Sequence, residues 1–457
     1  MISSILIANR GEIAVRIIRT CREMKIRTIA IHSTADAEAM HVRLADMALC
    51  VGPPSPRDSY LNIPAIMAAA VVSGADAIHP GYGFLSENAS FAEAVEAHGL
   101  VFIGPSAAHI RMMGDKIRAK ATMKEFGVPV VPGTEAAVTD VDDARVIAEE
   151  IGYPVLVKAA AGGGGRGMKV ARASAELDEA ISVAQAEARA AFGDGSVYLE
   201  KYLDTPRHIE VQVLGDQFGS VVHFGERDCS LQRRHQKLVE EAGSPALSDT
   251  ERNEIGTVVT SALQKIGYRN AGTIEFLYQD SRFYFIEMNT RLQVEHPVTE
   301  MVCGIDLVRE QIRVARGEPI GYGQEQIRFT GHAIECRITA EDPSTFIPSP
   351  GTISFFHQPG GIGVRMDTAV YSGYKVPPYY DSMIGKLIVH ASSRGEAIDR
   401  MRRALDECVM QGLKTVLPLL RAIMRDEEFE SGDYTIHWLE NFVMRFTPDQ
   451  TEDEKKA

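Results

Sequence analysis

The first hundred residues alternate between short apolar, β-prone runs and amphipathic helical segments. The runs Ile5–Ala8 and Thr28–His32 flank Glu12–Met24, in which apolar residues recur at helical spacing. The alternation continues with two more strands and two more helices, predicted at Ala75–His79, Val101–Ile103, Ile63–Ser73 and Ser90–His98. Strands that alternate with helices form a parallel sheet covered by helices, so the pattern predicts an α/β domain.

This first domain lacks the sequence of a dinucleotide-binding loop. The turn after the first strand, Asn9–Gly11, contains a single glycine, and the G-x-G-x-x-G spacing is absent. We therefore interpret the domain as a scaffold.

The 457 residues correspond to about three domains at roughly 150 residues each. We predict domains over 1–114, 115–330 and 331–446, followed by a charged, flexible tail over 447–457. In the middle region, helices are expected at Lys116–Phe126 and Ala175–Phe192, and strands at Val155–Lys158, Val197–Glu200, Ile209–Leu214, Ser220–Phe224, Gly272–Tyr278 and Phe283–Met288. In the third region, strands are expected at Ala333–Thr339, Thr352–Phe356, Gly363–Asp367 and Lys386–His390, and helices at Arg394–Val409 and Leu417–Asp426.

Composition narrows the functional class. With 45% hydrophobic and 24% charged residues, the chain can bury large cores and is globular. The net charge of −14 argues against a nucleic-acid-binding protein, although a local basic pocket remains compatible with it. No apolar stretch approaches the roughly 20 residues of a membrane span. Six scattered cysteines without a C-x-x-C motif favour reduced thiols, and we expect a cytoplasmic protein.

A glycine run is the first candidate for ligand binding. Gly162–Gly167 follows the apolar run Tyr153–Ala161 and precedes the strand-like Met168–Val170, so it would cap a hairpin. Backbone N–H groups in such a loop can approach phosphates closely, and the hairpin could close over them as a lid. Lys158, at the end of the apolar strand, requires an anionic partner. A mobile surface turn and a lysine that reaches solvent are the alternatives.

Two apolar strands carry carboxylates. Glu275 lies in one, and Glu287 and Asn289 lie at the end of the next, on one face. In a hairpin, Glu275 opposes Glu287 if 279 pairs with 283, which requires a three-residue loop over 280–282 or an equivalent bulge. Adjacent buried carboxylates repel unless a cation separates them, so the set predicts a Mg²⁺ or Mn²⁺ site shared with nucleotide phosphates. The alternative is that both acids are solvated.

Two neighbouring segments add charge. Arg291 offers a planar fork for a small oxyanion, and Glu295 is a candidate general base, unless this loop only neutralises its own charges. The basic segment Arg227–Lys237 is either a solvated face or the lining of a phosphate site, to which it would contribute His235 and Lys237. His208 is more often structural at such a position than in contact with a nucleotide.

Together these segments resemble a known family. The residues that carry the resemblance are Lys116, Lys158 with the following 159–167, Glu200–Leu203, Arg227–Glu241, Phe285–Glu300 and His79–Phe84. They are similar to the biotin carboxylase component of biotin-dependent carboxylases, of the acetyl-CoA carboxylase type. The resemblance extends from Ile5 to about Phe446.

The resemblance implies an α/β and α+β architecture. It consists of a Rossmann-like N-terminal domain, a central ATP-grasp domain with a mobile lid over about 131–203, and a C-terminal mixed-sheet domain. It also implies a ligase reaction in which ATP phosphorylates bicarbonate to carboxyphosphate, which breaks down to CO₂ and phosphate. CO₂ then carboxylates N1′ of biotin, and the phosphate takes the N1′ proton. Phosphoryl transfer of this kind relies on positioning and charge stabilisation, which fits the residue types described above.

The resemblance further implies residue roles. The ATP-binding residues would be Lys116, Lys158, Gly164, Gly165, Glu200, Lys201, Tyr202, Leu203, His208, Gln232, His235, Glu275 and Glu287, with the backbone of Lys201 and Leu203 at adenine. Glu275, Glu287 and Asn289 would hold Mg²⁺ or Mn²⁺, as two ions. Bicarbonate would bind to Lys237, Arg291, Gln293, Val294 and Glu295. Arg337, which spacing alone would identify as an exposed strand arginine, would stabilise the biotin enolate, with Tyr82 and Gly83 flanking biotin. The catalytic residues would be Arg291, Glu295, Lys237 and Arg337.

Partners follow from the resemblance as well. No Met-Lys-Met biotinylation sequence is present, so the biotin carboxyl carrier protein and the carboxyltransferase are expected on separate chains, with biotin as a carrier-bound substrate. A homodimer is expected, in which Arg19 and Glu23 either face the partner or pair within their helix. Acetyl-CoA, and hence fatty acid biosynthesis, is the first choice of final acceptor; pyruvate, propionyl-CoA and 2-oxoglutarate stay open. Another ATP-grasp ligase, joining a carboxylate to an amine, and a non-catalytic nucleotide-binding regulator are the competing functions.

Overall fold

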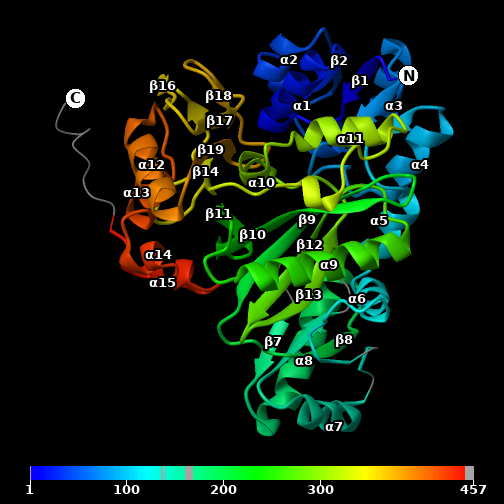
Figure 1. Ribbon diagram of the computed structural model, residues 1–457, viewed down its shortest axis with the longest axis vertical. Coiled ribbons are helices and arrows are strands. Elements are labelled where there is room, and N and C mark those ends of the chain that lie inside the picture. Colours follow the sequence, from blue (N-terminus) through cyan, green and yellow to red (C-terminus); the bar gives the residue numbers. More distant parts are fainter. Residues whose placement is uncertain (1, 135–136, 139, 160–167, 448–457) are drawn as a thin grey trace.

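A computed structural model describes residues 2–134, 137–138, 140–159 and 168–447. Its N-terminal part is a five-stranded parallel sheet of order β3-β2-β1-β4-β5, at the upper right of Figure 1. The predicted alternation of strands and helices is confirmed, but the edge strand β3 and the helices α2 and α5 were not predicted. The elements are β1 (Ser4–Ile7), α1 (Gly11–Glu23), β2 (Arg27–Ser33), η1 (Thr34–Asp36), α2 (Met40–Leu44), β3 (Met47–Gly52), η2 (Pro56–Asp58), α3 (Ile63–Ser73), β4 (Ala77–His79), α4 (Ala89–Ala97), β5 (Val101–Phe102) and α5 (Ala107–Gly114).

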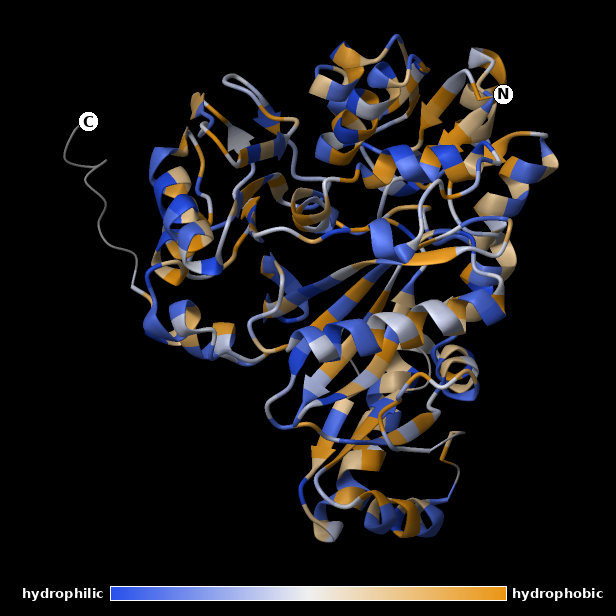
Figure 2. Ribbon diagram, in the orientation of Figure 1, coloured by the Kyte–Doolittle hydropathy of each residue, from blue (hydrophilic) through white to orange (hydrophobic). Residues whose placement is uncertain are grey.

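Local sequence accounts for these boundaries. The side chains of Asn62 and Asn88 accept hydrogen bonds from the first turns of α3 and α4, which fixes where those helices begin. Gly74 ends α3 with φ +65°, a conformation that glycine adopts without strain. Figure 2 shows the strands of this sheet as largely hydrophobic, whereas the surrounding helices also carry hydrophilic residues. Apolar side chains of these helices, such as Ile13 and Ile17 of α1 and Ile66 of α3, pack with the strands in the core.

An eight-stranded sheet forms the centre of the molecule, in the order β13-β12-β9-β10-β11-β14-β19-β17. It unites strands from both sides of residue 330, because β11 pairs with β14. The C-terminal sheet, expected to be mixed, is antiparallel in all of its described strand pairs. Its strands are β9 (Arg207–Gly215), β10 (Val221–Arg233), β11 (Gln236–Ala242), β12 (Asn270–Gln279), β13 (Arg282–Asn289), β14 (His332–Thr339), β17 (Val364–Thr368) and β19 (Met383–Ala391).

The β12–β13 hairpin decides whether the two predicted acids meet. Its turn has two residues, Asp280 and Ser281, both at positive φ, and Gln279 pairs with Arg282. The predicted three-residue loop is therefore wrong. The equivalent bulge is confirmed, because the register shifts by one residue between the Phe276–Phe285 and Glu275–Glu287 pairs. Glu275 consequently lies opposite Glu287, as the sequence predicted.

A separate three-stranded sheet, β7-β6-β8, lies at the bottom of Figure 1 with two helices beside it. β6 pairs with β7 in an antiparallel register that ends at Lys158 and Met168, so the strands predicted on either side of the glycine run are present. The run itself, including Gly164 and Gly165, falls outside the described residues. The elements are α7 (Val141–Ile151), β6 (Val155–Ala159), β7 (Met168–Ala171), α8 (Ser174–Phe192) and β8 (Val197–Lys201).

Several of the remaining helices pack on the large sheet, as α9 does on β9 and β10 and α12 does on β14 and β19. The remaining elements are α6 (Lys116–Glu125), α9 (Asp249–Ile266), α10 (His296–Cys303), α11 (Leu307–Ala315), η3 (Gln324–Gln326), β15 (Gly351–Thr352), β16 (Phe355–His357), β18 (Lys375–Val376), α12 (Arg394–Glu407), β20 (Val409–Gln411), α13 (Leu417–Ile423), α14 (Glu427–Ser431) and α15 (Trp438–Arg445). The strand predicted over 352–356 is thus split between β15 and β16. No helix in the described part of the chain has the length and apolar character needed to cross a bilayer. Most of the predicted tail, 448–457, lies outside the described residues.

Candidate functional site

A cavity of about 1460 Å³ lies between the three-stranded sheet and the large sheet. Every described residue to which the sequence assigned a role in binding ATP, the metal ion or bicarbonate lines it, as does Arg337. These residues are Lys116, Lys158, Glu200, Lys201, Tyr202, Leu203, His208, Gln232, His235, Lys237, Glu275, Glu287, Asn289, Arg291, Gln293, Val294, Glu295 and Arg337. Tyr82 and Gly83 are not among the described residues that line the cavity.

On one wall of the cavity, two lysines form ion pairs with the buried Glu200. Lys158 Nζ lies 2.5 Å from Glu200 Oε2, and Lys120 Nζ lies 2.8 Å from Glu200 Oε1. Burial acts to raise the pKa of Glu200, but the two ammonium groups lower it overall. The anionic partner that Lys158 requires is therefore a protein carboxylate in this structure.

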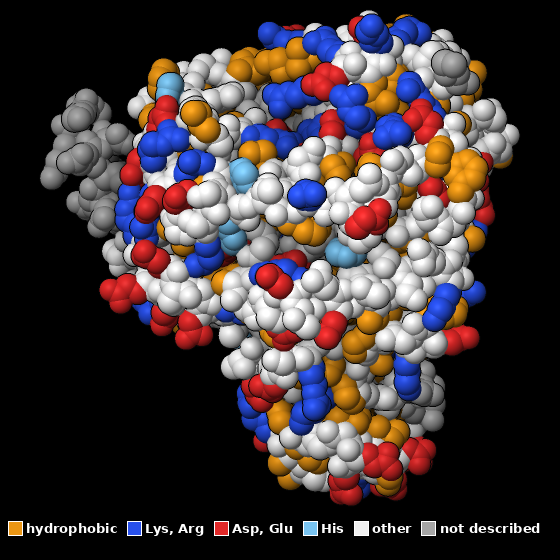
Figure 3. All heavy atoms as spheres, viewed as in Figure 1, with side chains coloured by type: hydrophobic (Ala, Val, Ile, Leu, Met, Phe, Trp, Pro, Cys, Tyr) orange, Lys and Arg blue, Asp and Glu red, His pale blue; other side chains and the backbone are white. Residues whose placement is uncertain are grey.

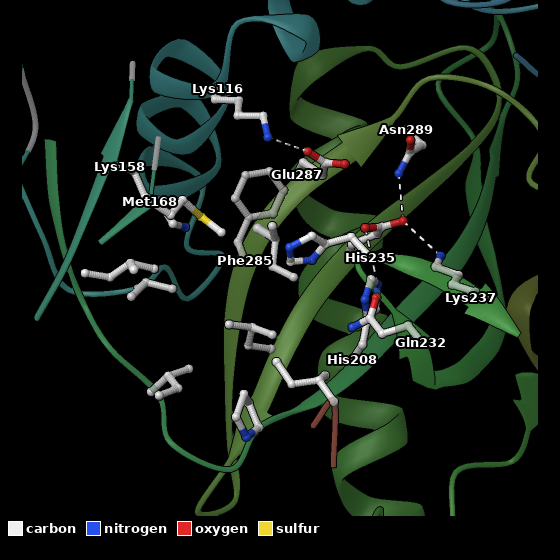
Figure 4. A pocket seen from close by; sticks show the side chains of 18 of the residues that line it. Lys116, Lys158, Met168, His208, Gln232, His235, Lys237, Phe285, Glu287 and Asn289 are labelled. Atoms are coloured by element: carbon white, nitrogen blue, oxygen red, sulfur yellow. Dashed lines mark hydrogen bonds and ion pairs between the residues drawn. The ribbon is translucent and has the colours of Figure 1, made fainter. Parts of the chain in front are cut away.

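Lys116, one turn before Lys120 on α6, extends towards the end of β13. Its Nζ lies 3.1 Å from Glu287 Oε2, and Figure 4 shows this pair together with Lys158 and Met168 of the three-stranded sheet. About a third of the Glu287 side chain is exposed, so its carboxylate faces the cavity.

Glu275 accepts contacts from four sides. Its Oε1 accepts hydrogen bonds from Asn289 Nδ2 at 2.9 Å and Gln293 Nε2 at 2.7 Å, and lies 3.1 Å from Lys237 Nζ. Its Oε2 lies 3.2 Å from His208 Nε2. Although burial acts to raise the pKa of Glu275, Lys237 and His208 lower it well below its usual range. The group is therefore an ionised oxygen donor.

The basic segment forms the β10–β11 hairpin. Its turn residues Arg234 and His235 both have positive φ and are exposed to solvent, and His235 lines the cavity together with Gln232 and Lys237. Partial desolvation lowers the pKa of His235; Glu440 opposes this effect, and nearby cations add to it. The solvated face and the cavity lining, considered as alternatives, thus apply to different residues within the segment.

Lys237 joins three buried acids. Its Nζ lies 2.6 Å from Glu210 Oε2, 3.1 Å from Glu275 Oε1 and 2.5 Å from Glu295 Oε1. Burial acts to lower the pKa of this ammonium, but the surrounding anions raise it well above its usual value. Lys237 is therefore charged and linked to both the metal-ligand candidates and the candidate base.

The candidate base, Glu295, lies between two cations. Its Oε2 lies 2.9 Å from Arg337 Nη2, and its Oε1 contacts Lys237. Despite burial, Lys237 and Arg337 lower the pKa of Glu295 well below its usual range. Arg337 also contacts Glu240 Oε1 at 2.5 Å, and burial raises the pKa of Glu240 to about 7. Arg337 is a cavity residue rather than the exposed strand arginine that its spacing suggests.

Arg291 is held by residues far apart in the sequence. Its Nε donates to Glu87 Oε2 at 2.9 Å, and its Nη2 donates to Asn289 Oδ1 at 2.8 Å. Glu87, which follows the N-terminal strand β4, was not identified from the sequence. The segment that carries Arg291 is thus fixed against both the first domain and the end of β13.

A fully buried arginine supports the whole group from behind. Arg227 donates to Glu210 at 2.5 Å and to Gln293 Oε1 at 2.6 Å, and its remaining donors reach Gln212, Thr273 and Thr299. Each of the five N–H groups of a guanidinium therefore has a partner. Arg227 holds Gln293 and Glu210 in place without lining the cavity.

Two of the residues missed from the sequence left a periodic signal. Glu210 follows His208 at a spacing of two on β9, which places both on one face of that strand. Lys120 follows Lys116 at a spacing of four on α6, which places both on one face of that helix. Arg227 and Glu87 gave no such signal, since their partners lie on other elements.

Biotin-flanking residues were also expected near the cavity. The hydroxyl group of Tyr82 donates to Glu12 Oε1 on α1, and burial raises the pKa of Tyr82 well above its usual value. The ammonium group of Lys386 lies 5.9 Å from the centre of the Tyr82 ring. Tyr82 therefore packs behind the cavity among buried charges.

The donors at the end of the hairpin fit a hard divalent cation. Glu275 and Glu287 supply carboxylate oxygens from paired positions, and Asn289 supplies an amide beside them. Oxygen donors of this type suit Mg²⁺, which binds through one or two carboxylates together with substrate phosphates. In this structure, Lys116 and Lys237 balance the two negative charges.

Charge is mixed on the face drawn in Figure 3, where Lys and Arg side chains are interspersed with Asp and Glu side chains. In the cavity, ammonium and guanidinium groups from several elements converge, which suits a small anionic ligand.

Three family models match the chain along its length. They are described as biotin carboxylase, N-terminal domain, over residues 1–110; carbamoyl-phosphate synthase L chain, ATP binding domain, over 115–322; and biotin carboxylase C-terminal domain, over 335–441. Together they cover most of the 457 residues.

Full-length relatives give the same result. The chain is 57% identical to the biotin carboxylase of Haemophilus influenzae, over 96% of this chain and 98% of that protein. It is 53% identical to a pyruvate carboxylase subunit of Methanothermobacter thermautotrophicus, over 97% of this chain and 90% of that protein.

A solved structure matches as closely in three dimensions. It is the biotin carboxylase domain dimer of the Hydrogenobacter thermophilus 2-oxoglutarate carboxylase, in complex with MgADP, ADP and bicarbonate. Its TM-score is 0.91 at 51% identity, over 98% of this chain and 99% of that chain.

Proposed function

The chain belongs to the biotin carboxylase family, and from this premise we propose how its cavity serves the reaction. The protein is an ATP-grasp ligase that carboxylates biotin with bicarbonate at the expense of ATP. The expected Rossmann-like, ATP-grasp and C-terminal arrangement is confirmed as a fold. The roles of individual residues, the identity of the partners and the final acceptor are the proposal.

ATP would lie between the three-stranded sheet and the β12–β13 hairpin. The backbone N–H of Lys201 already donates to Pro132 O, so Lys201 would meet adenine through its carbonyl group and Leu203 through its N–H. Lys116 from α6 and Lys158 from β6 would contact phosphates, and Gly164 and Gly165 would cover them. Glu200, His208, Gln232 and His235 complete the proposed ATP set, with Tyr202 beside the adenine segment.

Glu275, Glu287 and Asn289 are the residues that would hold Mg²⁺ or Mn²⁺, as two ions. Such cations neutralise charge on the phosphates of the bound nucleotide. The support for this assignment is the opposed pair of carboxylates and the MgADP bound by the Hydrogenobacter relative. Lys116 and Lys237 are paired with these acids in this structure, and with a metal ion on the acids both lysines would be available to anionic ligands.

Bicarbonate would bind between Lys237 and Arg291, with Gln293 and the backbone of Val294 beside it. An oxygen of bicarbonate attacks the γ-phosphorus of ATP, ADP leaves, and carboxyphosphate forms. Glu295 would accept the proton that bicarbonate loses. Its low pKa keeps it ionised but makes it a weak base, and transfer of Lys237 from Glu295 to bicarbonate would raise its basicity.

Carboxyphosphate then breaks down to CO₂ and phosphate in the cavity. The phosphate would take the N1′ proton of biotin, and N1′ would attack CO₂. Arg337, whose charge is ensured by Glu240 and Glu295, would stabilise the enolate form of biotin. Tyr82 and Gly83 would flank biotin from the N-terminal domain.

We also propose the surroundings of the reaction. Biotin would arrive on a carrier protein, and a carboxyltransferase on another chain would pass the carboxyl group to acetyl-CoA. Pyruvate and 2-oxoglutarate carboxylases occur among the relatives, and propionyl-CoA is a further candidate acceptor. A homodimer is supported by the dimer in the Hydrogenobacter structure, and a cytoplasmic location by the six free thiols. The domains would divide as 1–114, 115–330 with the lid over about 131–203, and 331–446.

Convergence of all the described candidate residues for ATP, metal and bicarbonate on one cavity carries this proposal. The test is bicarbonate-dependent ADP production by the purified chain with Mg²⁺ and free biotin, together with transfer of labelled bicarbonate to biotin. Stimulation by biotin is expected. ADP production without biotin stimulation would favour the amine-joining ligase, and nucleotide binding without ADP production would favour the regulator. Co-purification of the carrier protein and the carboxyltransferase identifies the acceptor pathway.

A further inference from the structure

Lys386 is a charged side chain that the proposed mechanism does not use. It lies in the middle of β19, among apolar residues, and its side chain is completely buried. Its Nζ donates to the backbone oxygen of Val294 at 2.7 Å and lies 3.1 Å from Glu12 Oε1. Lys386 is not among the described residues that line the cavity.

The large sheet fixes where this ammonium group lies. Lys386 pairs with Arg337 on β14 on one side and with Asp367 on β17 on the other. Glu12 reaches it from α1, and the same carboxylate accepts the hydroxyl group of Tyr82. Contacts with β14, β17 and α1 therefore fix the position of Lys386 independently of its contact with Val294.

A buried ammonium group lowers the stability of the fold unless it has well-placed partners, because its charge is removed from water. At such positions, a protein with an apolar residue of similar size is often no less stable. The neighbours of Lys386 on β19, Gly385 and Leu387, show that the strand otherwise follows an apolar pattern. Its distinctive contact is the one with the carbonyl group of Val294.

That contact acts on the proposed bicarbonate segment. The carbonyl group of Val294 and the N–H of Glu295 belong to one planar peptide unit. An ammonium group fixed by the sheet and bonded to this oxygen therefore sets the orientation of the peptide from which Glu295 departs. A shift of about 1 Å in such a segment can lower a rate by roughly a hundredfold.

We propose that Lys386 is a positioning residue for bicarbonate, which orients the Val294–Glu295 peptide from behind the cavity. This inference rests on the proposed function of the segment Arg291–Glu295. Because Lys386 also contacts Glu12, the partner of Tyr82, it ties the bicarbonate segment to the loop that would flank biotin.

The test compares Lys386→Met with Lys375→Met, an exposed strand lysine that serves as the matched control. Lys386→Met should raise the KM for bicarbonate at least tenfold and leave the KM for ATP within about twofold. Hydrogen exchange of a peptide that covers 291–296 should accelerate in this variant only. An unchanged KM for bicarbonate together with unchanged exchange overturns the proposal.

Two further measurements distinguish a folding defect, and a failure of the proposed function, from a failure of the positioning role. If Lys386→Met folds poorly, Lys386→Met/Glu12→Gln removes the unpaired acid together with the lysine, and the same rise in the KM for bicarbonate is expected from it. An equal rise in the KM values for ATP and bicarbonate overturns the positioning role. Failure of the wild-type protein to cleave ATP with bicarbonate would contradict the proposed function, whereas the exchange measurement would still decide whether Lys386 orders the segment.

Discussion

Glu275 and Glu287 lie directly opposite each other on neighbouring strands because Ile286 is an extra residue in β13. If Ile286 instead paired regularly after the two-residue turn, it would lie opposite Glu275, and Glu287 would point to the other face of the sheet. One bulged residue therefore decides whether two acids can share a ligand.

Glu287→Gln removes one of these carboxylates without changing side-chain size. We expect turnover to fall by two orders of magnitude or more, and the Mg²⁺ concentration for half-maximal activity to rise, because the amide is a weaker ligand for a hard cation. The melting temperature should stay within a few degrees, since the side chain is partly exposed. Glu125→Gln, at the exposed edge of the same cavity, is the control. Near-normal turnover in Glu287→Gln would remove the metal assignment.

Glu295→Gln tests the proposed base. Bicarbonate-dependent ATP cleavage should fall by about 10²–10⁴-fold, the usual contribution of general base catalysis. The Kd for ADP should be unchanged, because the carboxylate contacts Lys237 and Arg337 rather than the proposed nucleotide residues. Calorimetric titration with ADP and steady-state kinetics measure the two quantities. A variant that retains turnover would assign the proton to another acceptor.

Glycine should be favoured over alanine at position 281, in the turn of the β12–β13 hairpin. Ser281 has φ +57°, a conformation that is strained for a residue with a Cβ atom. Both Ser281→Gly and Ser281→Ala lose the hydrogen bond between the Ser281 hydroxyl group and Glu251, but only the glycine relieves the strain. Ser281→Gly should therefore be more stable than Ser281→Ala by about 1 kcal/mol, which equilibrium unfolding in urea measures. A glycine variant no more stable than the alanine variant would contradict the turn conformation.

Glu241 should make the protein sensitive to acid. Burial opposes ionisation, yet His332, Arg394 and Tyr434 contact this carboxylate and hold its pKa at about 2, against 4.5 in the unfolded chain. A lowered pKa contributes stability above the unfolded value, and this stability is lost as the pH falls from about 4.5 towards 2. The loss should be on the order of 3 kcal/mol.

Denaturant melts at several pH values test this prediction. Glu241→Gln should be destabilised at pH 7 and should lose less stability than the wild type between pH 4.5 and 2.5. Glu396→Gln, at the exposed start of α12, should follow the wild-type curve. Parallel curves for the wild type and Glu241→Gln would show that another acid is responsible.

Local sequence patterns predicted most of the fold. Periodicity located β1, β2, β4 and β5 of the N-terminal sheet and the helices α1, α3 and α4, and alternation along apolar strands placed Glu287 and Asn289 on one face. Those signals depend only on neighbours in sequence, which a single chain displays directly. The motif-based resemblance added residues such as Arg337, whose spacing alone indicated an exposed side chain.

Contacts between distant elements were not predictable in this way. Glu87 lies 204 residues from Arg291, and the buried Arg227 collects its partners from several other segments. The length of the β12–β13 turn was uncertain for a related reason, since a bulge can replace an added turn residue. Register and tertiary packing set these features, and neither is written in local sequence.

β11 and β14 are hydrogen-bonded neighbours in one sheet. Lys237 on β11, proposed for the first chemical step, and Arg337 on β14, proposed for the second, are therefore held by one pair of strands. A hybrid protein that took its last third from a relative would have to reproduce the alignment of Val239 with Cys336. A slip of one position would turn Arg337 away from Glu295. A crossover point between β11 and β14 should therefore often give inactive hybrids. Hybrids of relatives that are joined elsewhere in the chain should be active more often.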